Sequence, residues 1–103
     1  MTDPRSGRID FGKINRAALV DLPGALRPWV PDATVIGEEL QARNPTRQDR
    51  RPGSFRINIR TGRWCDFATA DKGGDVVSYV AYVAGIGQVE AARRLAAVLG
   101  LVA

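Results

Sequence analysis

The 103-residue sequence predicts one small α+β domain. Its hydrophobic residues recur at helical spacing near the N-terminus, alternate with polar residues over about 54–67, and recur at helical spacing again from residue 76. Hydrophobic residues make up 45% of the chain and charged residues 25%, as in globular proteins. We therefore expect N-terminal helices, a small antiparallel sheet around a hairpin at 54–67, and two C-terminal helices. Residues 1–10 are polar and are expected to be a disordered lead-in, and residues 11–103 to form the domain.

Two short helices are expected near the N-terminus. The hydrophobic residues with helical spacing are Ile14, Ala18, Leu22, Ala25 and Trp29. Pro23 interrupts this run, so the pattern predicts one helix over 11–20 and a second that begins near Pro23, with Asp21 as its N-cap. Prolines further on end the second helix. Residues 34–42 alternate weakly and predict a single strand, although 38–42 would also suit a helix.

A hairpin is the clearest element of the sequence. After a loop over 43–53, residues 54–60 alternate between an apolar face, which Trp64 joins as a core residue, and a polar face. Thr61 and Gly62 are expected to form a two-residue turn, followed by a returning strand over 63–67. The register would then place Arg60 opposite Arg63, Asn58 opposite Cys65 and Ile57 opposite Asp66.

The C-terminal third predicts two helices after a loop over 68–74. Asp75 or Gly74 caps a helix over 76–84, and a second helix runs over 88–99, with Gly100 just past its end. The residues expected to face inward are Val76, Val77, Val80 and Val83 on the first helix, and Val89, Ala92, Leu95, Ala96 and Leu99 on the second.

The positive charge is unevenly distributed along the chain. There are 15 lysines and arginines against 11 acidic residues, for a net charge of +4. Residues 43–63 hold seven arginines and one acid, Asp49, so this segment carries +6 and the rest of the chain −2. A segment of this kind predicts a polyanionic partner, with nucleic acid as the first candidate.

The residue types exclude several kinds of chemistry. The chain has no histidine and one cysteine, Cys65, which excludes an internal disulfide, histidine-based catalysis and a Cys/His zinc site. Cys65 is expected to be a buried or half-buried strand residue; the alternative is a nucleophile activated by neighbouring arginines. No catalytic residue, metal or cofactor is expected. The sequence shows neither a membrane span nor a secretory signal, so a cytoplasmic monomer without membrane contact is expected.

The polar face of the hairpin is the main candidate binding site. Period 2 places Arg56, Asn58 and Arg60 on this face, and the turn brings Arg63 beside them. The residues expected at the edges of a nucleic-acid footprint are Arg47, Arg50, Arg51 and Lys72. The alternative is a solvated polar face. The glycine-rich segment 71–75 opens a helix, and there a tight junction is favoured over a phosphate contact.

Four short motifs follow one another between residues 43 and 100. They are Asn44-Pro45-Thr46-Arg47, Pro52-Gly53-Ser54-Phe55, Trp64-Cys65-Asp66-Phe67-Ala68-Thr69 and Gly73-Gly74-Asp75, and a closing helix over 90–100 follows them. In this order and spacing they resemble the N-terminal zinc-ribbon domain of bacterial DNA primases. The sequence is most similar to the zinc-less version of that domain at the front of primase-helicase proteins of phages and other mobile elements.

The resemblance implies a zinc-ribbon-like sheet without its metal. The positions that match the four zinc ligands of the family are Asn44, Arg47, Asp66 and Thr69, none of which is a cysteine or a histidine. Asp66 lies on the apolar face of the hairpin, where an unpaired carboxylate is costly. We therefore expect Asp66 to pair with Arg47, with Asn44 and Thr69 nearby.

The resemblance also implies a function. In the family this domain binds single-stranded template DNA without polymerising, and Toprim and helicase domains follow it. A non-catalytic module that binds single-stranded DNA is therefore expected, while RNA stays open as the partner. One alternative is a protein-interaction module that docks onto replication partners through the hairpin and Arg93-Arg94. A third, a small enzyme that uses Cys65, is the least favoured.

Overall fold

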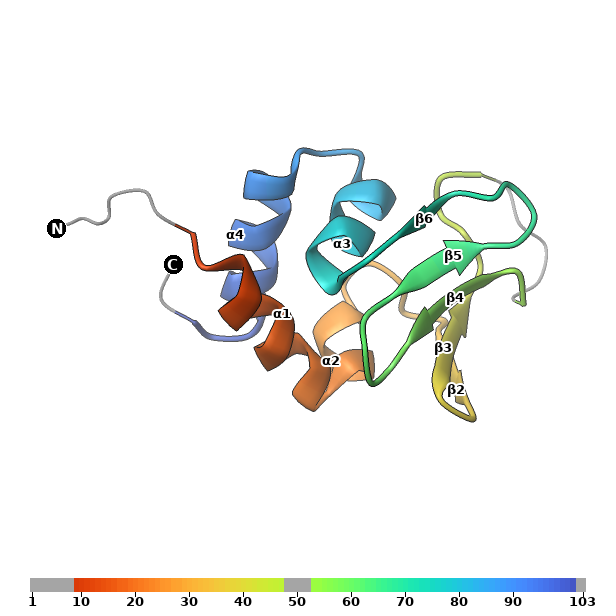
Figure 1. Cartoon of the computed structure of the whole chain (residues 1–103), viewed down its shortest axis with the longest axis horizontal. Helices are drawn as coiled ribbons and strands as arrows, with labels where there is room; N and C mark the ends of the chain where they lie inside the picture. The colour runs from red at the N-terminus through yellow and green to blue at the C-terminus, as the bar shows by residue number, and fades with distance from the viewer. Residues whose placement is uncertain (1–8, 48–52, 102–103) are drawn as a thin grey trace, which may run out of the picture.

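A computed structural model describes residues 9–47 and 53–101. Within these residues, helices lie at one end of the molecule and an antiparallel sheet at the other, which confirms a small α+β domain (Figure 1). In chain order the elements are α1 (Phe11–Val20), α2 (Leu22–Leu26), β2 (Thr34–Ile36), β3 (Glu39–Ala42), β4 (Phe55–Asn58), β5 (Trp64–Asp66), β6 (Lys72–Gly73), α3 (Val76–Ala84) and α4 (Gln88–Val98). The strands follow one another across the sheet as β2-β3-β4-β5-β6.

The predicted helices are confirmed. Their ends are defined by local capping residues. Asp21 caps α2, and its Oδ1 accepts from Gly24 N at 3.3 Å. Asp75 caps α3 in a capping box with Ser78. Asp10, which the sequence assigned to the lead-in, caps α1 through Lys13 N at 2.9 Å. Ile9, also assigned to the lead-in, packs against the core, and residues 1–8 lie outside the described residues.

The strand predicted over 34–42 is wrong, because this segment forms two strands. Gly37 has a φ of 63°, which glycine adopts without the steric cost of a side chain, and it reverses the chain between β2 and β3. Thr34 pairs with Gln41 and Ile36 with Glu39. The turn allows Glu39 to pair both with Ile36 of β2 and with Asn58 of β4.

The predicted hairpin is present, but its predicted register is wrong by two residues. Phe55 pairs with Asp66, Arg56 with Cys65 and Ile57 with Trp64. The turn is longer than two residues because Asn58 stabilises it with its side chain. Its Oδ1 accepts from Arg60 N at 2.9 Å and from Thr61 N at 3.0 Å. Arg60 therefore lies in the turn and does not face Arg63 across the ladder.

The loop predicted over 68–74 is also wrong in part, because Lys72 and Gly73 add an edge strand, β6, beside β5. Gly73 passes directly over Trp64. A Cβ at Gly73 would collide with the Trp64 indole Nε1 and lie 2.6 Å from Ser78 Oγ. These two atoms are themselves joined by a 2.9 Å hydrogen bond from the indole. Glycine is therefore required for the strand to cover the tryptophan.

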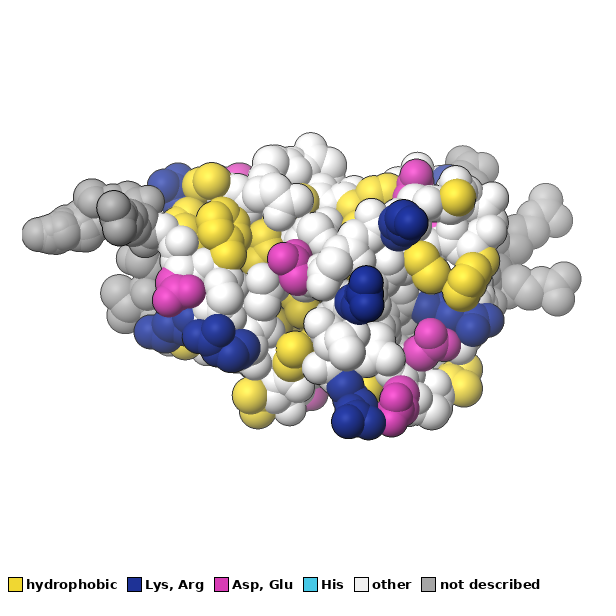
Figure 2. Space-filling model, viewed as in Figure 1, with side chains coloured by type: hydrophobic (Ala, Val, Ile, Leu, Met, Phe, Trp, Pro, Cys, Tyr) yellow, Lys and Arg dark blue, Asp and Glu magenta, His cyan; other side chains and the backbone are white. Residues whose placement is uncertain are grey.

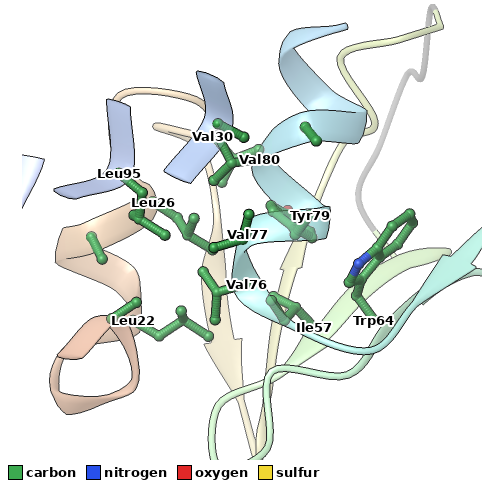
Figure 3. Close-up of a cluster of buried hydrophobic side chains, with 14 of the residues drawn as sticks. Leu22, Leu26, Val30, Ile57, Trp64, Val76, Val77, Tyr79, Val80 and Leu95 are labelled. Atoms are coloured by element: carbon green, nitrogen blue, oxygen red, sulfur yellow. The ribbon is translucent and has the colours of Figure 1, made fainter. Parts of the chain in front are cut away.

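The core lies between the inner face of the sheet and the helices (Figure 3). Phe55 of β4 stacks on Tyr79 of α3, with ring centroids 4.9 Å apart, and Trp64 meets Tyr79 edge-on at 5.8 Å. Trp64 is buried, as predicted. Tyr79, which the sequence did not single out, is the largest fully buried side chain.

One predicted core position on α4 is wrong. Val89 is 47% exposed, whereas Ala91, Ala92, Leu95 and Ala96 form the buried stripe of this helix. Ala91 lies about 200° around the helix from Val89, since each residue turns the helix by about 100°. On α3, Val76, Val77 and Val80 are buried and Val83 is partly buried. No helix among the described residues is long and apolar enough to cross a membrane.

Candidate nucleic-acid interface

The outer face of the sheet is the surface that no described helix covers (Figure 1). Paired residues on neighbouring antiparallel strands share a face, so one row of side chains crosses all the strands. This row is Thr34, Gln41, Arg56, Cys65 and Lys72. Arg63 lies on the same side, because it is bonded to Asn58 across the hairpin and alternates with the inward Trp64. We call this surface the outer sheet face.

The predicted footprint residues divide into four groups. Arg56, Arg63 and Lys72 lie on the outer sheet face. Asn58 and Arg60 hold or form the hairpin turn, and Arg47 contacts Asp66 at the inner side. Arg50 and Arg51 lie outside the described residues. Cys65, predicted as a strand cysteine, is half-buried between Arg56 and Lys72.

Besides Arg47, two more of the predicted cations are paired with acidic side chains. Arg56 Nη1 lies 3.3 Å from Glu39 Oε1, and Arg60 Nη1 lies 2.9 Å from Glu38 Oε2. Figure 2 shows basic side chains over the sheet that stand apart, with acidic and hydrophobic side chains between them. The surface is thus less positive than the segment charge predicted. Because both pairs are partly exposed, each contributes little to the free energy of unfolding. Either arginine can therefore exchange its carboxylate partner for another anion.

An exposed aromatic residue, Phe67, also lies on this surface, and the sequence reasoning missed it. Phe67 is 66% exposed, and the Arg56 guanidinium carbon lies 5.1 Å from its ring centroid. A signal was present in the sequence. Trp64 and Asp66 point inward, so the same alternation carries Phe67 outward after Cys65.

The inner end of β5 holds a polar cluster around Asp66, which we call the Asp66 cluster (Asn44, Arg47, Asp66 and Tyr82). Asp66 Oδ2 lies 2.9 Å from Arg47 Nη2 and accepts from Asn44 Nδ2 at 2.7 Å. These contacts confirm the predicted pairing of Asp66 with Arg47 and the predicted position of Asn44. The cluster ties the segment 43–47 to the sheet.

The fourth expected member, Thr69, does not contribute its side chain. Thr69 is exposed, and its Oγ1 accepts from Asp71 N at 3.3 Å. Ala68 N takes its place and donates to Asp66 Oδ1 at 2.8 Å. Tyr82 was not foreseen. Its hydroxyl accepts from Asn44 Nδ2 at 2.9 Å and donates to Asp71 Oδ2 at 2.8 Å, so it links the cluster to α3.

The surroundings of Asp66 keep its carboxylate ionised. Burial alone would raise the pKa of Asp66. Hydrogen bonds from Asn44, Arg47 and Ala68, together with the charge of Arg47, outweigh burial and lower the pKa to about 2. The carboxylate is fully covered, whereas Arg47 is 33% exposed. At neutral pH the cluster therefore contains an ionised, hydrogen-bonded pair.

The residues at the four positions matched to zinc ligands do not fit a zinc ion. Both Asp66 oxygens accept from Arg47, and Asn44 directs its Nδ2 donor at the same carboxylate. A guanidinium repels a metal cation, and Asp66 is the only carboxylate among these four positions.

We accordingly expect well under one zinc per purified chain, because the donor set lacks thiolates and imidazoles. Elemental analysis measures the content directly. A chelator should leave the thermal unfolding curve unchanged. A stoichiometric metal whose removal lowers the melting temperature would contradict this assignment of the Asp66 cluster.

No protein-family model matches the chain, and a search of curated proteins finds no match either. The geometry of the outer sheet face therefore carries the functional argument.

Proposed function

We propose that this chain is a non-catalytic module that binds single-stranded nucleic acid on the outer sheet face. The observation that carries the proposal is Phe67, an exposed aromatic ring held against Arg56 on the sheet face that no described helix covers. Open sheets with aromatic and basic side chains bind single strands by stacking bases and by neutralising phosphates. Arg63 and Lys72 supply further positive charge on the same surface.

The resemblance to primase N-terminal domains supports the same proposal. It favours single-stranded DNA as the ligand, a zinc-ribbon-like origin for the sheet, a cytoplasmic setting, and Toprim or helicase domains as partners in the same or another chain. RNA is a second ligand that the same surface fits, because stacking and phosphate contacts do not require a particular sugar.

A protein-interaction module is the second candidate, and one observation favours it. Strand β2 is an edge of the sheet, and its Val35 and Ile36 are 46% and 55% exposed. An unpaired edge with hydrophobic side chains can accept a strand from another protein. This candidate predicts partner binding without affinity for nucleic acid.

A salt titration with a labelled oligothymidylate tests the proposal. Each phosphate neutralised on a single strand contributes about −0.7 to the slope of log K against log salt concentration, so contacts from Arg56, Arg63 and Lys72 predict a slope of about −2. A blunt duplex of the same length should bind more weakly, because its bases cannot stack on Phe67. Absence of binding even at low salt would reject the proposal and favour the protein-interaction module.

The double variant Glu38→Gln with Glu39→Gln should bind the oligothymidylate several-fold more tightly at low salt. It removes the carboxylates that neutralise Arg60 and Arg56, so the slope should steepen by about one unit. Glu90→Gln is the matched control, because it releases Arg94 from a similar 3.0 Å pair on α4. Equal slopes in all three proteins would place the binding surface away from the hairpin.

A further inference from the structure

A shallow pocket lies where β5 and β6 form the edge of the sheet. Its volume is about 430 Å³. The residues that line it are Arg63, Trp64, Cys65, Lys72, Gly73 and Gly74. The pocket adjoins the outer sheet face, because Cys65 and Lys72 belong to the row of side chains that crosses all the strands.

The charges around this pocket favour an anion. Arg63 and Lys72 are exposed, and neither forms an ion pair with a described residue. No acidic residue lines the pocket. Three acids adjoin the lining residues in the sequence, and each has a hydrogen-bond partner elsewhere. Asp66 is paired with Arg47 in the Asp66 cluster. Asp71 Oδ2 accepts from the Tyr82 hydroxyl at 2.8 Å, and Asp75 Oδ1 accepts from Ser78 N at 2.8 Å.

The glycines give a ligand access to the backbone. Gly73 has no room for a side chain, because Trp64 and Ser78 lie against it. A Cβ at Gly74 would meet no atom within 4 Å, so nothing fills the space beside this residue. Two cations next to an open glycine backbone form a surface that suits the oxygens of a phosphate group.

We propose that this pocket binds one phosphate group of the strand held by the outer sheet face. The identity of that strand rests on the proposed function, whereas phosphate binding by the pocket does not. The phosphate is an internal phosphodiester, because Arg56 and Phe67 extend the same surface along the row from Lys72 and Cys65. A terminal phosphate monoester and inorganic phosphate would offer the pocket the same kind of oxygen atoms. The experiment below distinguishes both of them from an internal phosphodiester.

Cys65 reports on the pocket without any added label, because it is the only cysteine of the chain and lines the pocket. Its alkylation rate by N-ethylmaleimide is measured in increasing inorganic phosphate, with sodium chloride at equal ionic strength as the reference. A bound anion would cover the thiol and block its access to N-ethylmaleimide. We therefore expect saturable protection, with alkylation slowed roughly fivefold.

Two variants of equal size test the electrostatic part of the proposal. Gly74→Asn and Gly74→Asp both place a side chain where a Cβ meets no atom, so both should fold, with the same circular dichroism as the parent chain. The asparagine variant should retain most of the phosphate protection. The aspartate variant adds a carboxylate between Arg63 and Lys72 and should abolish it. Equal protection of Cys65 in both variants, or no protection in the parent chain, would overturn the proposal that this pocket binds phosphate.

Oligothymidylates with a 5′-hydroxyl or a 5′-phosphate separate the sources of the phosphate. Equal protection of Cys65 by both supports an internal phosphodiester, and protection by the phosphorylated strand alone overturns that assignment. Protection by inorganic phosphate without any oligonucleotide binding would reject the proposed function and leave the pocket in place. Oligonucleotide binding without any protection of Cys65 would reject the pocket and leave the proposed function in place.

Discussion

Replacing Asp66 with asparagine is expected to lower the free energy of unfolding by about 2–3 kcal/mol. Removing one partner of a fully buried ion pair typically costs about 3–5 kcal/mol, because the other partner is left uncompensated. The cost should be smaller here, because Arg47 is 33% exposed and can regain water. In the Asp66→Asn variant the side-chain NH₂ group would also point its hydrogens at the N–H donors of Arg47 and Asn44, which leaves those donors without an acceptor. For a domain of this size, the melting temperature should fall by roughly 10 °C or more.

Thermal unfolding followed by circular dichroism measures this loss. Glu90→Gln is the matched control, because the Arg94–Glu90 pair has a similar 3.0 Å distance but is half-exposed, and should cost less than about 0.5 kcal/mol. Arg47→Met should destabilise the chain as well, since it leaves the buried carboxylate with hydrogen bonds only from neutral donors. Melting temperatures within a degree of the parent chain for both Asp66→Asn and Arg47→Met would show that the Asp66 cluster does not support the fold.

The same cluster makes stability depend on pH in the acid range. The pKa of Asp66 is lowered from 3.8 to about 2, so the folded state binds this proton less readily than the unfolded state does. The contribution of Asp66 to stability is therefore complete above pH 4 and is lost as the pH falls towards 2. The stability gap between the parent chain and Asp66→Asn, about 2 kcal/mol at neutral pH, should close over this interval. A gap that stays constant down to pH 2 would contradict the lowered pKa.

The helices were predictable because their signals are local. Asp21 and Asp75 each precede an apolar helical pattern, and Gly100 follows one. The pairing of Asp66 with Arg47 was also predictable, since alternation placed Asp66 inward and the resemblance placed Arg47 beside it. The first inference used residues within one element, and the second used two motifs whose order matches one family pattern.

The arrangement of the outer sheet face was less predictable, because it depends on turns that side chains determine. The Asn58 side chain lengthens the hairpin turn and shifts the register, and Gly37 folds a single expected strand into two. The β3–β4 register then brings Glu39 to Arg56, and the longer hairpin turn leaves Arg60 beside Glu38. Contacts between residues 17 or 22 positions apart follow from the register and cannot be obtained from either strand alone.

Phe67→Ala is expected to weaken binding of the oligothymidylate by about 5- to 100-fold, since stacking contributes about 1–3 kcal/mol per base. One face of the ring is held by Arg56, and the side chain is otherwise largely exposed, so a base has room to stack on it. The slope of log K against log salt concentration should not change, because phenylalanine carries no charge. The loss of affinity should therefore be similar at every salt concentration.

Fluorescence anisotropy of a labelled oligothymidylate measures both the affinity and the slope. Val35→Ala is the matched control, because Val35 is also an exposed hydrophobic residue of the sheet but pairs with Leu40 on the inward-facing row. Phe67→Trp should bind at least as tightly as the parent chain, since indole offers a larger stacking surface. Circular dichroism should be unchanged in all three variants. If Phe67→Ala binds as tightly as the parent chain while the salt slope stays near −2, the phosphates contact this surface but the bases do not stack on Phe67.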